Sequence, residues 1–256
     1  MRTLLHRAIP SRQAATLLVL LPGAYDTPED LERQGFVHAV QAAGLAADVL
    51  LADAHTDYYT GQQIVPSLHT EVLTPARDAE YAQVWLAGIS LGGYGSLLYA
   101  QAHPGMVNGL FLMAPFMGRR DLPAAIARAG GLHAWTGTLE TADQQDLALW
   151  RWLRGRAAAP CAPRHVPPIW LGYGEADRFA ASSRLLAAAL PAAQVFTTPG
   201  GHQWAPWLRL WARFLGVAPW QGLAGAKAAS SGAGCSGPGS ADPDRSPAAQ
   251  SSRSSG

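Results

Sequence analysis

Short apolar runs alternate along this chain with longer segments whose apolar residues recur every three or four positions. The short runs are typical of buried strands and the longer segments of helices packed on a sheet. The predicted strands cover residues 16–21, 46–52, 83–87, 107–114, 169–173 and 193–197. The predicted helices cover residues 28–43, 62–79, 93–102, 122–128, 142–154, 182–190 and 204–215. This alternation predicts an α/β fold with a mostly parallel central sheet and helices on both faces.

Turn residues mark the ends of the first predicted helix. Thr27 suits the N-cap and Pro28 the first helical position, and Gly44 ends the helix that follows. The polar residues 53–61 predict a loop after the second strand. We therefore expect one continuous helix over 28–43, followed by a strand and an irregular segment.

The spacing of the elements predicts one domain, residues 1–220, which is long enough to bury a sizeable core. About fifty residues separate the fourth and fifth strands, so we expect a small helical insert at about 116–167. Residues 221–256 are rich in Ala, Gly, Ser and Pro and cannot bury enough apolar surface to order themselves. We predict that this tail is disordered.

The composition of the chain argues against several classes of function. A formal net charge of +1 gives no electrostatic footprint for nucleic acid. The two cysteines, Cys161 and Cys235, have neither the number of a disulfide scaffold nor the spacing of a metal site. Asp53, His55 and Asp57 form a cluster of metal-ligand residue types, but a polar loop explains them better. We expect no bound metal and no cofactor.

The sequence Gly-Ile-Ser-Leu-Gly at 88–92 lies between a predicted strand and a predicted helix. A Gly-x-Ser-x-Gly in that position is a nucleophile elbow, a sharp turn that presents its serine above the sheet. In a chain with 27 glycines the pattern also arises by composition, and the alternative is a turn whose serine merely caps a helix. In the elbow interpretation, Ser90 lies at a helix N-terminus and the Leu91 N–H faces a developing oxyanion.

A serine nucleophile needs a base, and the base needs an acid that fixes its tautomer. His202 is the one histidine in a glycine-rich loop directly after a late strand. Asp177 follows the preceding strand, at its carboxyl end, and Glu175, two residues earlier, is the reserve candidate. The working residues of a parallel sheet gather at the carboxyl ends of its strands. We therefore expect Ser90, His202 and Asp177 to meet there.

The chain resembles the α/β-hydrolases, specifically the bacterial serine esterases, over about residues 16–215. The resemblance is carried by Leu-Pro-Gly-Ala-Tyr at 21–25, Gly-Ile-Ser-Leu-Gly-Gly at 88–93, Gly-Glu-Ala-Asp at 174–177 and Gly-Gly-His-Gln-Trp at 200–204. It implies the chain order Ser, Asp, His of a catalytic triad. It also implies a second oxyanion donor after Gly23: Ala24 is our first choice and Tyr25 the second. Because about fifteen residues precede the first predicted strand, the early antiparallel strands of that fold must be shortened or absent.

These residues predict a serine hydrolase that cleaves carboxylic esters or thioesters through an acyl-enzyme on Ser90. An acyltransferase or a peptidase-like acyl hydrolase would use the same triad, and a non-catalytic binding protein could retain the fold. The expected partner is a small-molecule ester, and the sequence leaves the oligomeric state open.

The N-terminus allows two interpretations. Arginines precede the apolar residues 14–21, as in a secretory signal. We prefer a central strand at 16–21, because cleavage near Ala24 would remove both that strand and the loop that catalysis needs. The chain is therefore expected to be cytoplasmic, with secretion as the alternative, and no apolar run reaches the ~18 residues of a membrane span.

The insert also allows two interpretations, which are compatible. Its apolar residues, among them Leu147, Leu149, Trp150 and Leu153, either line or close an acyl pocket above Ser90 or pack the insert onto the body of the domain. Trp150 and Trp152 are the residues whose replacement would separate the two.

Overall fold

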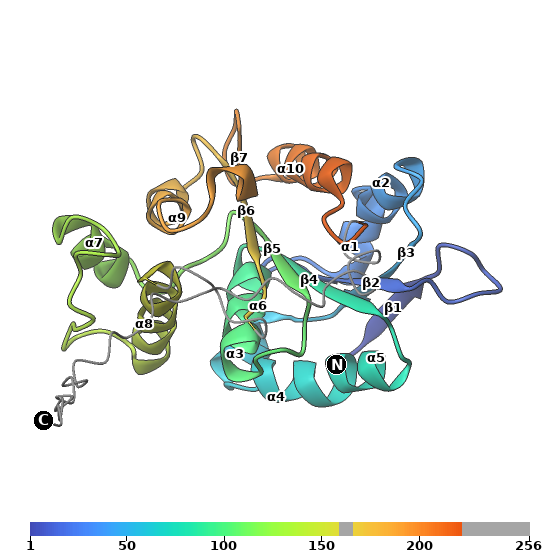
Figure 1. The fold of residues 1–256 in the computed structure, drawn as a ribbon, viewed down its shortest axis with the longest axis horizontal. Coiled ribbons are helices and arrows are strands. Elements are labelled where there is room, and N and C mark those ends of the chain that lie inside the picture. Colours follow the sequence, from blue (N-terminus) through green and yellow to red (C-terminus); the bar gives the residue numbers. More distant parts are fainter. Residues whose placement is uncertain (159–165, 222–256) are drawn as a thin grey trace, which may run out of the picture. The chain divides into compact units, whose positions relative to one another are not determined.

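Seven strands form one sheet in the order β1-β3-β2-β4-β5-β6-β7 in a computed structural model that describes residues 1–158 and 166–221 (Figure 1). The strands are β1 (Thr3–His6), β2 (Thr16–Leu21), β3 (Ala47–Ala52), β4 (Gln83–Ile89), β5 (Gly109–Met113), β6 (Ile169–Gly174) and β7 (Val195–Thr198). β1 pairs antiparallel with β3, and all other pairs are parallel. The predicted α/β fold is confirmed.

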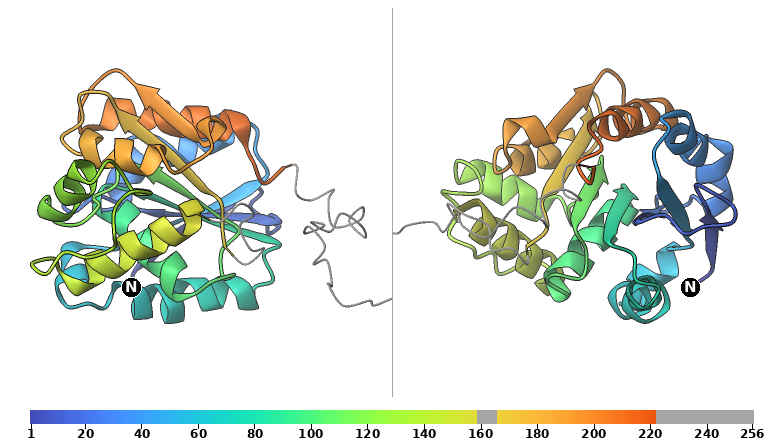
Figure 2. Two further views of the ribbon diagram at one scale, coloured as in Figure 1. Left: turned by 60° about the vertical axis from the view of Figure 1, so that its left-hand side comes forward. Right: turned by 45° about the vertical axis from the view of Figure 1, so that its right-hand side comes forward.

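Helices cover both faces of this sheet. They are α1 (Pro28–Arg33), α2 (Phe36–Ala42), α3 (Thr56–Thr60), α4 (Ile64–Leu68), the π-helical η1 (His69–Leu73), α5 (Thr74–Asp78), α6 (Leu91–Ala102), α7 (Asp121–Arg128), α8 (Gln144–Ala158), α9 (Ala180–Ala187), the 3₁₀ turn η2 (Ala192–Gln194) and α10 (Trp204–Val217). Buried residues of α1, α2 and α10 share one core with the sheet, and those of α4 to α9 share another. Figure 2 shows the sheet between these two layers.

The central strands are buried along their whole length. Every residue of β2, β4 and β5 is buried, because helices cover both of their faces. Alternate residues of one strand therefore enter different cores: Leu17 and Val19 pack with α6, and Leu18 and Leu20 pack with α2 and α10. This double burial explains why continuous apolar runs located the strands so well.

Two local expectations need correction, and one strand was not predicted. The helix predicted over 28–43 is two helices, because Gly35 adopts a left-handed conformation, φ 92°, between α1 and α2. The loop predicted over 53–61 contains the short helix α3. The short edge strand β1 was not predicted, although its four residues agree with the expectation of a shortened antiparallel edge.

The Thr27 cap is confirmed. Its side chain accepts the Asp30 N–H, and the Asp30 carboxylate accepts the Thr27 N–H at 2.8 Å, which completes a capping box at the start of α1.

Met1–Trp220 form one compact unit. Residues 222–256 of the predicted tail and residues 159–165 of the insert lie outside the described residues. In the part of the chain that the structure describes, no helix combines the length and apolarity needed to cross a bilayer.

Candidate active site

Ser90 lies on a sharp turn between β4 and α6. Its backbone has φ 51° and ψ −110°, a conformation that costs a non-glycine residue about 1–3 kcal/mol and persists only where neighbours enforce it. The Ser90 N–H donates to the Met113 carbonyl at 2.9 Å, and the Ser90 carbonyl accepts the Phe116 N–H at 2.9 Å. The end of β5 thus clamps both sides of the strained residue.

Glycines make this turn possible. A Cβ at Gly88 would lie 2.3 Å from the Gly92 carbonyl, and a Cβ at Gly92 would lie 2.4 Å from the Leu21 oxygen. Both distances are far inside van der Waals contact with backbone atoms that cannot rotate away. The glycine spacing is therefore a packing requirement between β2, β4 and α6, and it fixes where the Ser90 hydroxyl emerges.

Two further loops meet beside Ser90, after β6 and after β7. The Glu175 N–H donates to Thr198 O at 2.9 Å, and the Ala176 N–H donates to Gly200 O at 3.0 Å. A Cβ at Gly174 would lie 2.4 Å from the Gly200 oxygen, so only glycine lets the loops approach this closely. These bonds hold the segment carrying Asp177 against the segment carrying His202.

A chain of hydrogen bonds joins the three predicted residues. His202 Nε2 lies 3.0 Å from Ser90 Oγ, and His202 Nδ1 lies 2.8 Å from Asp177 Oδ2. With the proton on Nδ1, the imidazole donates to Asp177 and accepts the Ser90 hydroxyl. The other Asp177 oxygen accepts the Phe179 N–H at 2.7 Å, so both carboxylate oxygens are held. The structure therefore brings Ser90, His202 and Asp177 together.

Burial strengthens this arrangement. The Asp177 side chain is fully buried and the His202 side chain is 10% exposed. Phe179 and Trp207 pack edge-to-face against the His202 ring, with centroids 5.0 and 4.9 Å away. Trp207 is a buried core residue, and it also forms part of the wall of the site. The two aromatic rings hold the imidazole and exclude water from its bond with Asp177.

The remaining predicted residues lie as follows. Glu175 is exposed, and the carboxylate that pairs with His202 is that of Asp177. Leu91 is the first residue of α6, so its N–H has no acceptor within that helix. Ala24 lines the same hollow as Ser90 and makes no backbone N–H bond to another described residue. Tyr25 also lines the hollow, and it is 94% exposed.

The hollow over Ser90 has a volume of about 280 Å³. Its wall contains the turn after β2, the loop after β6 and the start of α10. Two charged residues in it were missed by sequence reasoning, Asp26 and Arg178. Each follows a predicted site residue by one or two positions, and that proximity was the available signal.

Asp26 folds back over the turn that carries Ala24. Its Oδ2 lies 2.5 Å from where a Gly23 Cβ would be, and that Cβ would itself lie 3.9 Å from the Ser90 Cβ. Burial and the nearby negative charge of Asp30 raise the pKa of Asp26, while a Gly23 N–H bond and the proximity of His202 oppose the rise. A second carboxyl group, that of Asp26, therefore borders the site.

None of the described residues of the insert lines this hollow. Leu147, Leu149, Trp150 and Leu153 are all buried in the core shared with α6, and none lines the space over Ser90. The expectation that these residues line or close an acyl pocket is wrong, because α8 packs on α6 as one of the covering helices of the sheet.

Polar contacts fix the insert in that position. Buried Asp146 accepts the Tyr94 hydroxyl at 2.6 Å and the Arg119 N–H at 2.9 Å. The Trp150 indole N–H donates to the Met117 carbonyl at 2.9 Å. Helix α8 is thus tied both to α6 and to the chain leaving β5.

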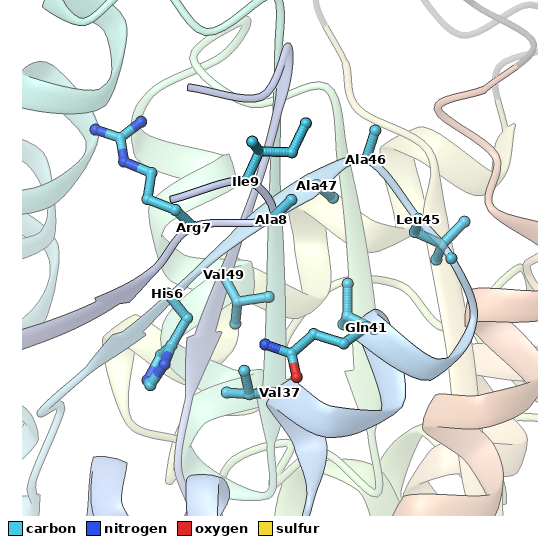
Figure 3. A pocket seen from close by; sticks show the side chains of 12 residues that line it. His6, Arg7, Ala8, Ile9, Val37, Gln41, Leu45, Ala46, Ala47 and Val49 are labelled. Atoms are coloured by element: carbon cyan, nitrogen blue, oxygen red, sulfur yellow. The ribbon is translucent and has the colours of Figure 1, made fainter. Parts of the chain in front are cut away.

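A separate hollow of about 300 Å³ lies at the amino-terminal end of β3. Figure 3 shows Val37 and Gln41 of α2 facing His6 of β1 and Val49 of β3. Catalytic groups of parallel sheets gather at the opposite, carboxyl end. We therefore assign this hollow no part in the chemistry at Ser90.

The loop cluster considered for a metal has other contacts. Arg2 Nε donates to Asp53 at 3.1 Å, and His55 Nδ1 lies 3.7 Å from Asp57. Within residues 1–158 and 166–221, no three His, Cys, Asp or Glu side chains are grouped to hold a metal ion.

Comparison with known proteins places this geometry in context. Residues 52–213, more than half of the chain, match the family described as "Putative esterase". No curated protein sequence matches the chain.

Several solved structures share the fold. Est1E from Butyrivibrio proteoclasticus is 18% identical with a TM-score of 0.58, and the match covers 87% of this chain and 94% of Est1E. The S-formylglutathione hydrolase FrmB from Staphylococcus aureus is 15% identical, TM-score 0.55, over 78% of this chain and 79% of FrmB. FphF, a fluorophosphonate-binding serine hydrolase of Staphylococcus aureus, is 16% identical, TM-score 0.55, over 78% and 82%. These similarities establish the α/β-hydrolase fold.

Proposed function

Because the chain belongs to the esterase family, we propose that it hydrolyses carboxylic esters through an acyl-enzyme on Ser90. The observation that carries the proposal is the hydrogen-bonded chain from Ser90 Oγ through His202 to buried Asp177. A serine hydroxyl is a weak nucleophile at neutral pH, and this arrangement supplies both a base for its proton and an acid that orients the base.

Acylation begins when Ser90 Oγ attacks the ester carbonyl carbon. The Ser90 proton moves to His202 Nε2, and Asp177 stabilises the resulting imidazolium. The carbonyl oxygen becomes an oxyanion, which the Leu91 N–H at the start of α6 and the Ala24 N–H bind. When the intermediate collapses, the C–O bond to the alcohol breaks and His202 gives its proton to the departing oxygen.

Deacylation repeats these steps with water. His202, now neutral, takes a proton from a water molecule, and the oxygen of that water attacks the acyl carbon. When the tetrahedral intermediate collapses, the bond between the acyl carbon and Ser90 Oγ breaks. His202 returns the proton to Ser90 Oγ, and the carboxylic acid is released. The chemistry uses the side chains of this chain and no metal or cofactor. A thioester would follow the same steps with sulfur as the leaving atom.

A fluorophosphonate probe tests the nucleophile. We expect the probe to label Ser90, and Ser90→Ala to lose both the label and ester turnover by several orders of magnitude while the fold survives. Ser67→Ala on α4 is the matched control and should keep both. Labelling that persists in Ser90→Ala, for example at Ser182 or Ser183, refutes the assignment.

Product analysis then distinguishes hydrolysis from transfer. With a p-nitrophenyl ester in water, we expect one equivalent of free acid for each p-nitrophenol released. If an added alcohol or amine takes most of the acyl group at millimolar concentration, the protein is an acyltransferase that uses the same triad.

A further inference from the structure

A second hollow lies between α7 and α9, next to the site. Its volume is about 470 Å³, which is within the usual range of small-molecule pockets. Its lining is mostly apolar, and the apolar side chains come from the two facing helices and the residue before α9: Pro123, Ala124, Ala127, Phe179, Ala181 and Leu185. Gly118, Arg120, Arg178 and Ser182 complete the lining. Phe179 holds Asp177 and His202 in place, and the other five apolar residues have no part in the chemistry described above.

Small side chains keep this hollow open. Ala124 and Ala127 are three positions apart on one face of α7, and Ala181 and Leu185 are four apart on one face of α9. The opposite faces are anchored, because Leu122 and Ile126 of α7 and Leu186 of α9 are buried in the core. The helices therefore cannot close the space by sliding together without leaving core contacts, so it is a built feature of the domain.

The hollow adjoins the site at Arg178 and Phe179. Arg178 lines both this hollow and the one over Ser90. Phe179 lines the second hollow while its ring packs against His202 and against Phe116, 5.7 Å away. Phe116 in turn donates its N–H to the Ser90 carbonyl. One aromatic side chain thus separates this apolar space from the reacting groups.

The position of His202 distinguishes the two halves of an ester. The departing alcohol receives its proton from His202 Nε2, so it must leave from the hollow that His202 and Gln203 line. The second hollow contains neither residue. Ser90, which keeps the acyl group, lines the same hollow as His202, so the acyl chain begins there and extends past the shared Arg178 toward α7 and α9.

We propose that the hollow between α7 and α9 is the acyl-chain subsite, and that it selects esters of unbranched, apolar carboxylic acids of medium length. This inference rests on the proposed function. Each methylene that enters an apolar hollow is worth about 0.8 kcal/mol, or about fourfold in kcat/KM. Activity should rise with acyl length and stop rising where the hollow ends.

The test fills the hollow. Ala124→Phe and Ala127→Phe each add a phenyl ring on the lining face of α7, at positions exposed enough to accept it without disturbing the core. Ala129→Phe, an exposed position just after α7 that does not line the hollow, is the matched control. The readout is kcat/KM for p-nitrophenyl esters from acetate to decanoate, with melting temperatures to verify folding.

For wild type, kcat/KM should be higher for octanoate than for acetate. Both filling variants should lower the octanoate-to-acetate ratio about 15-fold or more, as expected when two methylenes lose their contacts. The control should keep the wild-type ratio. The proposal is overturned if folded Ala124→Phe and Ala127→Phe both keep that ratio. It is also overturned if they change selectivity across a series of alkyl acetates instead, since the hollow would then bind the alcohol.

The failure of the proposed function has a different signature. If the proposed function is wrong, the wild-type protein hydrolyses none of the esters and Ser90 takes no fluorophosphonate label. The proposed subsite is then refuted as well. If wild type is active and labelled, but Ala124→Phe and Ala127→Phe keep its acyl selectivity, the subsite alone is refuted.

Discussion

Replacing Trp150 separates packing from substrate binding in the insert. Its side chain is fully buried, and its indole N–H donates to the Met117 carbonyl at 2.9 Å. Trp150→Ala removes nearly the whole side chain from a packed core and leaves that carbonyl without its donor. Core Trp→Ala changes cost about 3–5 kcal/mol, and a domain of this size loses about 2–4 °C in Tm per kcal/mol. We therefore expect Tm to fall by about 10 °C.

The same variant should keep the substrate preference of the wild type, because Trp150 lines neither the hollow over Ser90 nor the one between α7 and α9. Thermal unfolding monitored by circular dichroism gives Tm, and a p-nitrophenyl ester series well below Tm gives the acyl-length profile. Trp152→Ala is the matched control: Trp152 is half-buried beside Arg156, so its loss should lower Tm by less than half as much. A normal Tm with an altered acyl-length profile for Trp150→Ala refutes this reasoning and restores the lid interpretation.

Central strands and their loops were predictable because one physical cause dominates there. A strand covered on both faces must be apolar throughout, so β2, β4 and β5 appear as continuous runs that few other structures would produce. A parallel sheet then gathers the loops after its strands at one edge, and that rule, together with the Gly-x-Ser-x-Gly motif, predicted that Ser90, Asp177 and His202 would meet.

Helix boundaries were less predictable because single backbone conformations decide them. Residues 28–43 carry one apolar stripe, and nothing in its spacing reveals that Gly35 turns left-handed and divides the helix. The prediction that apolar insert residues line an acyl pocket failed for another reason. Burial of Leu149 and Trp150 follows from their apolarity, but the sequence does not say which surface buries them, and α6 rather than a substrate does so.

Asp26 and Arg178 were not predicted because isolated charged residues in loops have no periodic signal. Their importance comes from contacts between segments far apart in the chain: the turn after β2, the loop after β6 and the start of α10 share one hollow. Only the register of β2 beside β4 and of β6 beside β7 brings these segments together. The residues that border the candidate site are thus harder to predict than the residues proposed to be catalytic.

Two carboxyl groups border His202, and two substitutions should show that their roles differ. Asp177→Asn should lower kcat/KM by about 10⁴ with little change in Tm, because the amide preserves the packing but favours the wrong tautomer of His202; a near-normal rate, measured with p-nitrophenyl butanoate, contradicts the assignment of Asp177. Asp26→Asn should instead act on stability. Burial and the charge of Asp30 raise the pKa of Asp26, so the folded protein binds the proton more tightly than the unfolded chain does. The stability that this proton contributes is fully present in acid and is lost as the pH rises through the folded pKa. At pH 7 the ionised carboxylate therefore destabilises the fold, by less than about 1 kcal/mol once solvent screening is counted. Asp26→Asn removes that charge and should melt slightly above wild type at pH 7, and the difference in Tm should shrink as the pH is lowered toward 4. If instead the variant melts below wild type at pH 7 and the gap closes in acid, the ionised carboxylate stabilises the turn over Gly23, and burial is not the dominant influence on Asp26.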